Sequence, residues 1–430
     1  MRIGIVADDL TGAADSAAPF ARRGGQAFVG FTLDRGAALG RYAGDALSLN
    51  AGTRDLQNAK PTLIASITRR AARRLIEFAP TLYYKKIDST LRGHLRVELD
   101  AMRRELPNRL ALICPAFPAN GRTVAQGVLH LHGVPWTQTE FAPTRPLAAP
   151  AVRAAFDFAG DSTTAELSLG AVREGVDALE HTLNRLADEG VQTFCCDAVT
   201  QTDLEILAQV ILRQPDRYLP VGSAGLAAAI AACLPAAPLE NLASPPSLAR
   251  NERVGKGDGG LGQAFKTGRV LVVVGSLHPA SRQQAAFLAA KAGIEPIRLE
   301  FSKETTNFEI ARQQLHTQMM AKQRIAMLMT SELPSSMEPV YGLSNFVAWA
   351  LEYPHRWRFS CLVVTGGDTA LHVLGRLGSG IRVTGETQPG VITGHLKRRT
   401  GGKLDGLPVI TKAGGFGMEE TLARCVGLVE

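Results

Sequence analysis

The sequence is poor in cysteine and contains no long apolar run, and each shortage excludes a class of protein. Its six cysteines among 430 residues are scattered and none forms a Cys-x-x-Cys pair, so neither a disulfide framework nor a structural zinc site is expected. Cys195 and Cys196 are adjacent within an apolar stretch, which is typical of buried, reduced thiols. No apolar run approaches the roughly 20 residues of a membrane-spanning helix, so we expect no membrane partner.

Aromatic residues are also scarce, at 6% of the chain, although the net charge is +7. The densest basic cluster, Arg69, Arg70, Arg73 and Arg74, has helical spacing beside Leu75. This pattern favours the solvated face of an amphipathic helix over a nucleic-acid surface, which would add aromatic side chains. Anionic small ligands suit the charge equally well. The first residues enter a strand-like stretch without the pattern of an export signal, which predicts a cytoplasmic protein.

Short apolar segments alternate with helical stretches along the whole chain. The strand candidates are 2–7, 27–31, 46–49, 82–86, 110–114, 193–196, 219–222, 270–275, 325–329, 361–365 and 409–411. Continuous apolar runs followed by helices are typical of parallel strands covered on both faces. We therefore predict an α/β fold of two α/β domains with mainly parallel sheets. Ligand sites are expected at the carboxyl ends of the strands, in the cleft between the domains.

The length favours at least two domains, and one segment breaks the alternating pattern. Residues 244–263 lose periodicity and fill with proline, glycine and charge. We predict a linker over residues 244–265, which separates a domain of residues 1–243 from a domain of residues 266–430.

Two adjacent carboxylates, Asp8 and Asp9, follow the first predicted strand and precede a Thr-Gly pair that opens a helix. An aspartate in this place can hydrogen-bond to a substrate hydroxyl or take its proton. The alternative is that one of them caps the following helix. The pair predicts a ligand role for at least one carboxylate.

Polar residues also crowd the end of the strand predicted over 82–86. The candidate ligand-binding residues there are Lys85, Lys86, Asp88, Ser89 and Arg92. Lysine and arginine beside hydroxyls and a carboxylate suit a ligand that carries a carboxylate or phosphate, because they combine charge with directional donors.

Two further arginines follow predicted strands. Arg54 comes after the third strand and could grip a carboxylate with two hydrogen bonds, although a surface arginine is an equal alternative. Arg122 follows a turn built from two prolines and an Asn-Gly pair, and either reaches the same pocket or has a structural role.

The second half of the chain has three glycine turns, each directly after an apolar strand. The candidate nucleotide-binding residues in them are Ser276, Gly366, Gly367, Asp368, Thr369, Gly414 and Gly415. Paired glycines let the backbone approach closely, and free N–H groups at a helix start attract phosphate oxygens. Three such turns favour a phosphate-binding surface. No Walker-type loop is present, and no dinucleotide fingerprint follows a predicted strand.

Taken together, these motifs resemble the four-carbon acid sugar kinase family, formerly a domain of unknown function, which includes D-threonate, D-erythronate and 3-oxotetronate kinases. The motifs are ADDLTGAAD, KKIDSTLRGH, PAFPANGRT, GSAGLA, TGGDTA and TKAGGFG, and they occur in family order across nearly the whole chain. Leu10 stands where phenylalanine is more usual, but the polar residues around it are kept.

The resemblance implies a kinase that uses ATP to phosphorylate the terminal (C4) hydroxyl of a four-carbon sugar acid. It implies that residues 1–243 bind the acid and residues 266–430 bind the nucleotide. It further implies that Asp9, Arg54 and the Lys85–Asp88 stretch hold the acid. Ser276, residues 366–369 and Gly414 would hold ATP.

Phosphoryl transfer requires mainly positioning and charge neutralisation. Our hypothesis takes Asp9, Lys86 and Asp88 as the catalytic candidates. Asp9 would orient or deprotonate the hydroxyl, and Lys86 with Arg92 would steady the carboxylate or the transferring group. Asp368 would help to hold a Mg²⁺ ion that bridges the ATP phosphates.

Two other functions fit the same patterns: a sugar-acid dehydrogenase, and a non-catalytic sugar-acid-binding protein. Neither the acid nor its stereochemistry follows from the motifs. We expect no nucleic-acid partner, and the frequency of two-fold symmetry makes a homodimer the default oligomer.

Overall fold

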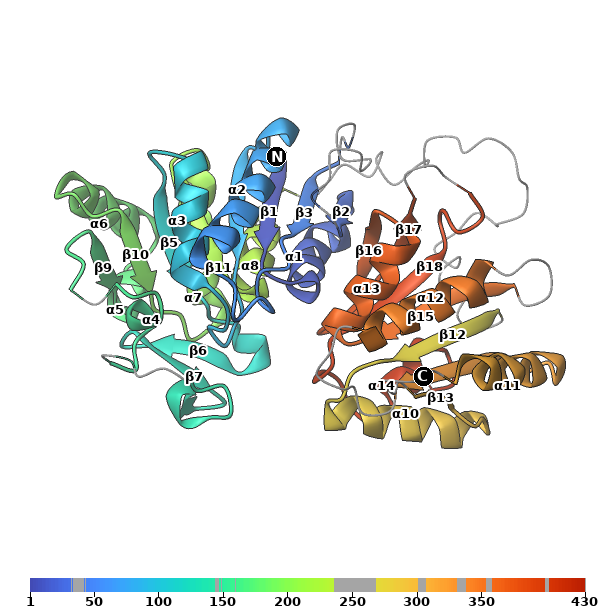
Figure 1. Cartoon of the computed structure of the whole chain (residues 1–430). Coiled ribbons are helices and arrows are strands. Elements are labelled where there is room, and N and C mark those ends of the chain that lie inside the picture. Colours follow the sequence, from blue (N-terminus) through green and yellow to red (C-terminus); the bar gives the residue numbers. More distant parts are fainter. Residues whose placement is uncertain are drawn as a thin grey trace. The chain divides into compact units, whose positions relative to one another are not determined.

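The computed structural model describes residues 1–31, 33, 42, 44–143, 147, 149–158, 160–235, 268–300, 307–330, 338–352, 358–398 and 402–429. These residues fall into two compact units, one up to residue 235 and one from residue 268 onward. Figure 1 draws the first in blue to green and the second in yellow to red. The linker predicted over residues 244–265 lies outside the described residues. None of the described helices is both long enough and apolar enough to cross a membrane.

A parallel sheet forms the centre of the first unit, with strands in the order β2-β3-β1-β4-β11-β5-β10-β9. Its strands are β1 (Ile3–Ala7), β2 (Ala27–Gly30), β3 (Ala46–Asn50), β4 (Leu82–Lys86), β5 (Leu110–Cys114), β9 (Thr164–Leu167), β10 (Thr193–Cys196) and β11 (Tyr218–Gly222). All residues of β1, β3, β4 and β11 are buried, as expected for parallel strands covered on both faces.

Helices and one small antiparallel sheet complete the first unit. The helices are α1 (Leu10–Arg22), α2 (Pro61–Phe78), α3 (Leu95–Glu105), α4 (Val152–Ala155), α5 (Leu169–Arg173), α6 (Val176–Asp188), α7 (Gln201–Arg213) and α8 (Ala224–Cys233). The small sheet consists of β6 (Arg122–Ala125), β7 (Val128–Leu131) and β8 (Val134–Pro135), with 3-10 turns at Pro118–Asn120 and Trp136–Gln138.

Local sequence signals set the helix ends. The Asp9 side chain accepts from Gly12 N (2.9 Å) and so caps α1. Thr200 and Asp203 form a reciprocal capping box at the start of α7. Pro61 occupies the first turn of α2, where a missing N–H costs nothing.

The second unit also has a central sheet, in the order β13-β14-β12-β15-β18-β17-β16. Pairing is parallel from β13 to β18 and antiparallel from β18 to β16. The strands are β12 (Arg269–Val274), β13 (Ile297–Leu299), β14 (Ile325–Thr330), β15 (Phe359–Thr365), β16 (Gly380–Gln388), β17 (Val391–Lys397) and β18 (Pro408–Lys412). The helices are α10 (Pro279–Ala292), α11 (Phe308–Met320), α12 (Glu338–Glu352), α13 (Gly367–Leu377) and α14 (Thr421–Cys425).

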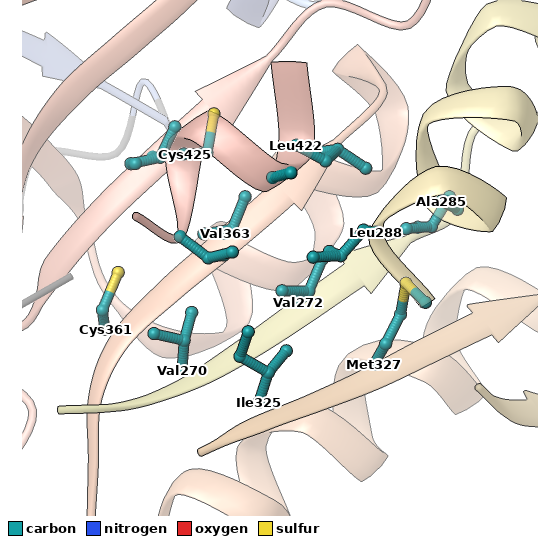
Figure 2. Close-up of a cluster of buried hydrophobic side chains, with 14 of the residues drawn as sticks. Val270, Val272, Ala285, Leu288, Ile325, Met327, Cys361, Val363, Leu422 and Cys425 are labelled. Carbon is teal, nitrogen blue, oxygen red and sulfur yellow. The ribbon is translucent and has the colours of Figure 1, made fainter. Parts of the chain in front are cut away.

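Alternate residues of three neighbouring strands build the apolar layer beneath α10 and α14 (Figure 2). The labelled side chains are Val270, Val272, Ile325, Met327, Cys361 and Val363 from the sheet, with Ala285, Leu288, Leu422 and Cys425 from the helices. Each buried valine, leucine, isoleucine or methionine of this layer stabilises the fold by about 1.5–3 kcal/mol relative to exposure.

Most of the predicted strands are confirmed, but some strands carry too weak a signal to be found. Strands β16 and β17 were not predicted, because their antiparallel hairpin mixes glycine and polar residues with single apolar ones. The edge strand β9 and the small sheet were missed for the same reason.

The expectation of buried thiols holds for five of the six free cysteines, and Cys233 is half-buried. Burial raises the pKa of Cys114 and Cys195 to about 12. The basic cluster lies on amphipathic α2, where Arg69 and Arg73 both pair with Glu105 of α3 (2.5 and 2.8 Å).

Candidate active site

Three neighbouring strands of the first unit end at the same level. In the order β3-β1-β4, Ala7 is in register with Asn50 on one side and with Lys86 on the other. The residues that follow these strands therefore emerge together at one edge of the sheet. This edge brings together the predicted site residues Asp8, Asp9, Arg54, Lys86 and Asp88.

Arg54 binds all three of these carboxylates. Its Nε and Nη2 donate to the two oxygens of Asp8 (both 2.8 Å), and Nη2 also lies 2.9 Å from Asp9 Oδ1. Its Nη1 lies 3.8 Å from Asp88 Oδ1. Arg54 is not a surface arginine, since only 14% of its side chain is exposed and its Nε and Nη2 contact carboxylates.

The surroundings of Asp8 and Asp9 act on their pKa values in opposite directions. Burial favours the neutral form of Asp8, but the charges of Arg54, Lys85 and Lys86 outweigh it and lower the pKa. Burial raises the pKa of Asp9, where the negative charges of its neighbours offset much of the effect of Arg54. Asp9 is therefore the more basic of the two carboxylates.

Asp88 has a different set of contacts. It accepts from Arg92 Nε and Nη2 (2.6 and 3.2 Å) and from the Thr90 hydroxyl. Burial opposes its ionised form, but Arg54, Arg92 and Thr90 outweigh burial and hold the pKa of Asp88 far below its usual range. These contacts suit a group that orients arginines better than one that takes a proton. Ser89 lies beside it in the same turn, half-buried.

Lys86 lies against the start of α1. Its Nζ donates to Ile87 O (2.8 Å) and, among the described residues, forms no ion pair. A Cβ at Gly12 would lie 2.6 Å from this nitrogen and 2.5 Å from Asp9 Oδ1. Glycine at position 12 thus makes room for an ammonium group beside the helix N-terminus and the Asp9 carboxylate.

Lys85 points away from this group, because successive side chains of a strand face opposite sides. Its Nζ pairs with Glu98 Oε2 of α3 (2.8 Å), and both side chains are only 1% exposed. The hydroxyl of Thr53 donates to the other oxygen of Glu98 (2.6 Å). Substrate contact by Lys85, which the sequence predicted, is disfavoured by this burial and pairing.

The loop after β5 is held against the same edge. Ser223 caps α8 and donates to Ala116 O (2.8 Å), and a Cβ at Gly225 would lie 2.6 Å from that carbonyl. The glycine–serine motif at 222–227 thus packs the proline-rich loop in place. At the start of β6, Arg122 interacts electrostatically with both Asp88 and Arg92, and burial lowers its pKa.

The three glycine turns of the second unit meet around Ser276. A Cβ at Gly366 would lie 3.2 Å from Ser276 Cβ, and one at Gly414 would lie 2.5 Å from Ser276 Oγ. A Cβ at Gly275 would clash with Thr369, 2.1 Å from its Oγ1. A side chain at Gly275 would be blocked, and one at Gly366 or Gly414 would require Ser276 to move. Gly415 lies in the same turn, beside His278.

The N-terminus of α13 opens at this meeting point. Gly366, with φ +98°, precedes the helix and provides no side-chain cap, so the first N–H groups, from Gly367 onward, stay available to a ligand. Asp368 is exposed in the first turn, and Thr369 is buried behind it. Within the described residues no cluster of three or more histidine, cysteine or acidic side chains could hold a metal ion.

The sequence did not single out three residues that complete these arrangements: Thr53, Glu98 and Ser281. The position of Glu98 carried a signal, because it shares a helix face with Leu95, Leu99 and Met102, and a carboxylate on an apolar face indicates a buried partner. Ser281 carries no such signal, although it bonds to Thr365 Oγ1 (3.0 Å) and donates to Gly414 O (2.7 Å).

Comparison with protein families assigns the two halves separately. Residues 3–230 match the family described as the sugar-binding N-terminal domain, and residues 271–422 match the nucleotide-binding C-terminal domain. The matched ranges follow the two units of the fold.

Full-length relatives include two proteins named D-threonate kinase. The chain is 30% identical to one from Salmonella typhimurium, over 100% of this chain and 99% of the relative. It is 33% identical to one from Bordetella bronchiseptica, over 98% and 96%. At 27% identity it also matches a D-erythronate kinase from Heliobacterium modesticaldum (98% and 95%) and a 3-oxo-tetronate kinase from Methylobacterium radiotolerans (100% and 99%). A solved structure from Salmonella typhimurium shares the fold, with a TM-score of 0.75, 22% identity and coverage of 99% and 98%.

Proposed function

This chain belongs to the four-carbon acid sugar kinase family, and from that premise we propose that it transfers the terminal phosphoryl group of ATP to the C4 hydroxyl of a four-carbon sugar acid. The first unit would bind the acid and the second would bind ATP. The observation that carries this proposal is the pairing of two kinds of site in one chain. One is a set of carboxylates and cations at the β1, β3 and β4 ends, and the other is a set of glycine turns around Ser276.

The contacts of the first unit support a division of roles among its charged groups. Arg54 engages Asp8 and Asp9 through Nε and Nη2, so it would hold these two carboxylates in place. Lys86 has donors to spare, and Arg92 is half exposed, so these two would bind the substrate carboxylate or the transferring phosphoryl group. Asp88 and Ser89 would lie beside the bound acid, and Asp8, which is only 1% exposed, would act by positioning Arg54.

Asp9 is our candidate for the group that receives the hydroxyl proton. Among the described residues its contacts all use Oδ1, which leaves Oδ2 for a substrate hydroxyl. Its raised pKa makes it a better base than Asp8 or Asp88. The capping bond fixes the orientation of the carboxylate, so the helix cap and the proton acceptor would be the same residue.

Ser276, Gly366, Gly367, Thr369, Gly414 and Gly415 would surround the ATP phosphates with backbone N–H and hydroxyl donors. Magnesium commonly binds through one or two carboxylates together with substrate phosphates. Asp368, exposed beside the N-terminus of α13, fits as the one carboxylate. When bound, the ion would neutralise phosphate charge during transfer.

The test is an ADP-release assay with D-threonate, D-erythronate and 3-oxotetronate, each with ATP and Mg²⁺. We expect ADP release that depends on at least one of these acids. A parallel thermal-shift titration compares ATP with NAD and NADP, because a true ligand stabilises by mass action. Stabilisation by a nicotinamide cofactor and not by ATP would overturn the proposal in favour of a dehydrogenase. Stabilisation by ATP without turnover of any of the acids would instead favour a non-catalytic sugar-acid-binding protein.

A further inference from the structure

Several carbonyl groups of the loop after β18, residues 413–418, accept hydrogen bonds from buried side chains. Lys412 Nζ donates to the carbonyl oxygens of Ala413 (2.7 Å), Gly414 (3.1 Å) and Phe416 (2.8 Å). Two residues of α10 add donors from the same side. Ser281 donates to Gly414 O (2.7 Å), and Gln284 donates to the carbonyl oxygens of Phe416 (3.0 Å) and Gly417 (3.1 Å).

The lysine cannot itself reach a ligand. Lys412 is only 1% exposed, and it lies two residues after Ile410, so its side chain emerges on the same face of the sheet as the apolar layer of Figure 2. Its ammonium group has three N–H donors, and three carbonyl oxygens accept them. In a Walker-type loop, by contrast, the lysine contacts the phosphates directly.

The direction of these carbonyl groups also fixes the direction of the N–H groups that follow them in the loop. In a planar trans peptide the C=O of one residue and the N–H of the next point in opposite directions. With four carbonyls drawn inward, the N–H groups of Gly414, Gly415, Gly417 and Met418 face the other way. Within the described part of the chain these four groups form no hydrogen bond. Successive free N–H groups of this kind form an anion-binding concavity.

We propose that Lys412 is a positioning residue for nucleotide binding. Its buried ammonium group holds the 413–418 loop in the conformation that presents backbone N–H groups to the phosphates of ATP. The backbone of Lys412 extends the effect, because its carbonyl accepts from Gly366 N (2.9 Å) and so ties this loop to the turn that begins α13. The inference rests on the proposed nucleotide site and names a residue that shapes it without touching the ligand.

The test is steady-state kinetics and ATP thermal-shift titration of Lys412→Met, which keeps the length of the side chain but removes its charge and donors. We expect KM for ATP to rise about 10-fold or more, in line with the loss of charge-assisted hydrogen bonds. The KM for the sugar acid, and kcat at saturating ATP, should stay within about twofold. A purely structural lysine would lower the melting temperature and leave KM for ATP unchanged.

Arg324→Met is the matched control. Arg324 is a half-buried cation that donates to a backbone carbonyl of this unit, Val426 O (2.8 Å), and it is not part of the glycine turns. We expect this control to lower stability without changing KM for ATP. If both variants raise KM for ATP equally, the effect comes from a general destabilisation of the second unit, and the inference is wrong.

A second variant keeps the test decisive if Lys412→Met does not fold. Gln284→Leu removes the α10 donor to the carbonyl oxygens of Phe416 and Gly417 and should raise KM for ATP by a smaller factor, about threefold to tenfold. An unchanged KM for ATP in the folded variants overturns the role of Lys412. Failure of the wild-type protein to bind ATP would instead overturn the proposed function, so the two failures are distinguishable.

Discussion

Asp8 and Asp9 are neighbours in sequence, yet one is held as a stable anion and the other is kept more basic. The difference arises from geometry, because Arg54 makes two hydrogen bonds to Asp8 and only one contact with Asp9. Burial then raises the pKa of Asp9, while the charge of Arg54 overrides burial at Asp8. At this scale the chemistry of the site depends on which carboxylate the arginine grips more firmly.

Replacing Asp9 with asparagine tests its role as the proton acceptor. Asparagine caps helices as well as aspartate does, so the free energy of unfolding should change little. We expect kcat to fall by about 10²–10⁴-fold because the base is lost. The measurement is kcat with ATP and the preferred acid, alongside urea unfolding. Near-normal kcat in a folded variant would remove Asp9 from the mechanism.

The pH dependence of kcat offers an independent test of the same residue. A base must be ionised to act, so activity falls as the pH drops through its pKa in the complex. Since burial raises the pKa of Asp9, the acid limb of kcat should lie above the usual aspartate range. Asp9→Asn should lose this limb from its residual activity. An acid limb that persists unchanged in the variant would assign the titration to another group.

The Lys85–Glu98–Thr53 cluster acts at the scale of elements. It joins α3 to β4 and to the loop after β3, and two of its members directly precede the site residues Lys86 and Arg54. A buried ion pair adds little net stability, because the cost of removing both charges from water offsets their attraction. The main effect of this pair is therefore to align α3 with β4.

Removing one partner of this ion pair should differ sharply from removing both. Glu98→Leu leaves the Lys85 charge buried and unpaired, and should destabilise the fold by about 3–5 kcal/mol. Lys85→Met combined with Glu98→Leu should recover most of that loss. The measurement is urea unfolding of the single and double variants. If the double variant is as unstable as the sum of both single variants, the cluster is not a coupled pair.

The close approach of α1 to Lys86 gives a prediction about Gly12. Alanine would raise helix propensity, but its Cβ would collide with both Asp9 Oδ1 and Lys86 Nζ. We expect Gly12→Ala to lower kcat/KM for the acid at least tenfold by displacing these groups. Gly375→Ala in α13 is the control, because nothing lies within 4 Å of its Cβ position. That control should keep full activity and gain up to about 1 kcal/mol in stability.

The sequence predicted the strand ends well because buried parallel strands are marked by continuous apolar runs. Polar clusters after those runs identified the residues that gather at the β1, β3 and β4 ends. Their pairing was not predictable, because it depends on contacts between distant segments. Lys85 and Lys86 read alike in the sequence, but strand alternation sends one to Glu98 and the other to Gly12.

The same limit applies to the second unit. Glycine turns after strands pointed to a phosphate-binding surface, and the structure brings all three together around Ser276. The direction of each peptide group, which decides whether a turn offers N–H or C=O groups, follows from contacts such as those of Lys412. The contacts that Ser281 and Gln284 add depend on the packing of α10 against this loop, which local sequence does not encode.

At the scale of the whole molecule, the two units should respond to mutation separately. Arg92→Gln removes a charge-assisted contact from the first unit and should raise KM for the acid about 10–100-fold, with KM for ATP nearly unchanged. Gly366→Ala forces a side chain into a backbone with φ +98° and should raise KM for ATP instead. Each variant is the control for the other. A variant that raised both KM values equally would contradict the division of labour.

The central claim is that this chain moves a phosphoryl group from ATP to the terminal hydroxyl of a four-carbon sugar acid. Phosphorus and proton NMR of a complete reaction with ATP, Mg²⁺ and the acid tests it most directly. We predict one new phosphomonoester, coupled to the two protons on C4, formed in equal amount to ADP. Free inorganic phosphate in place of that ester, or a phosphoester at another carbon, would contradict the account.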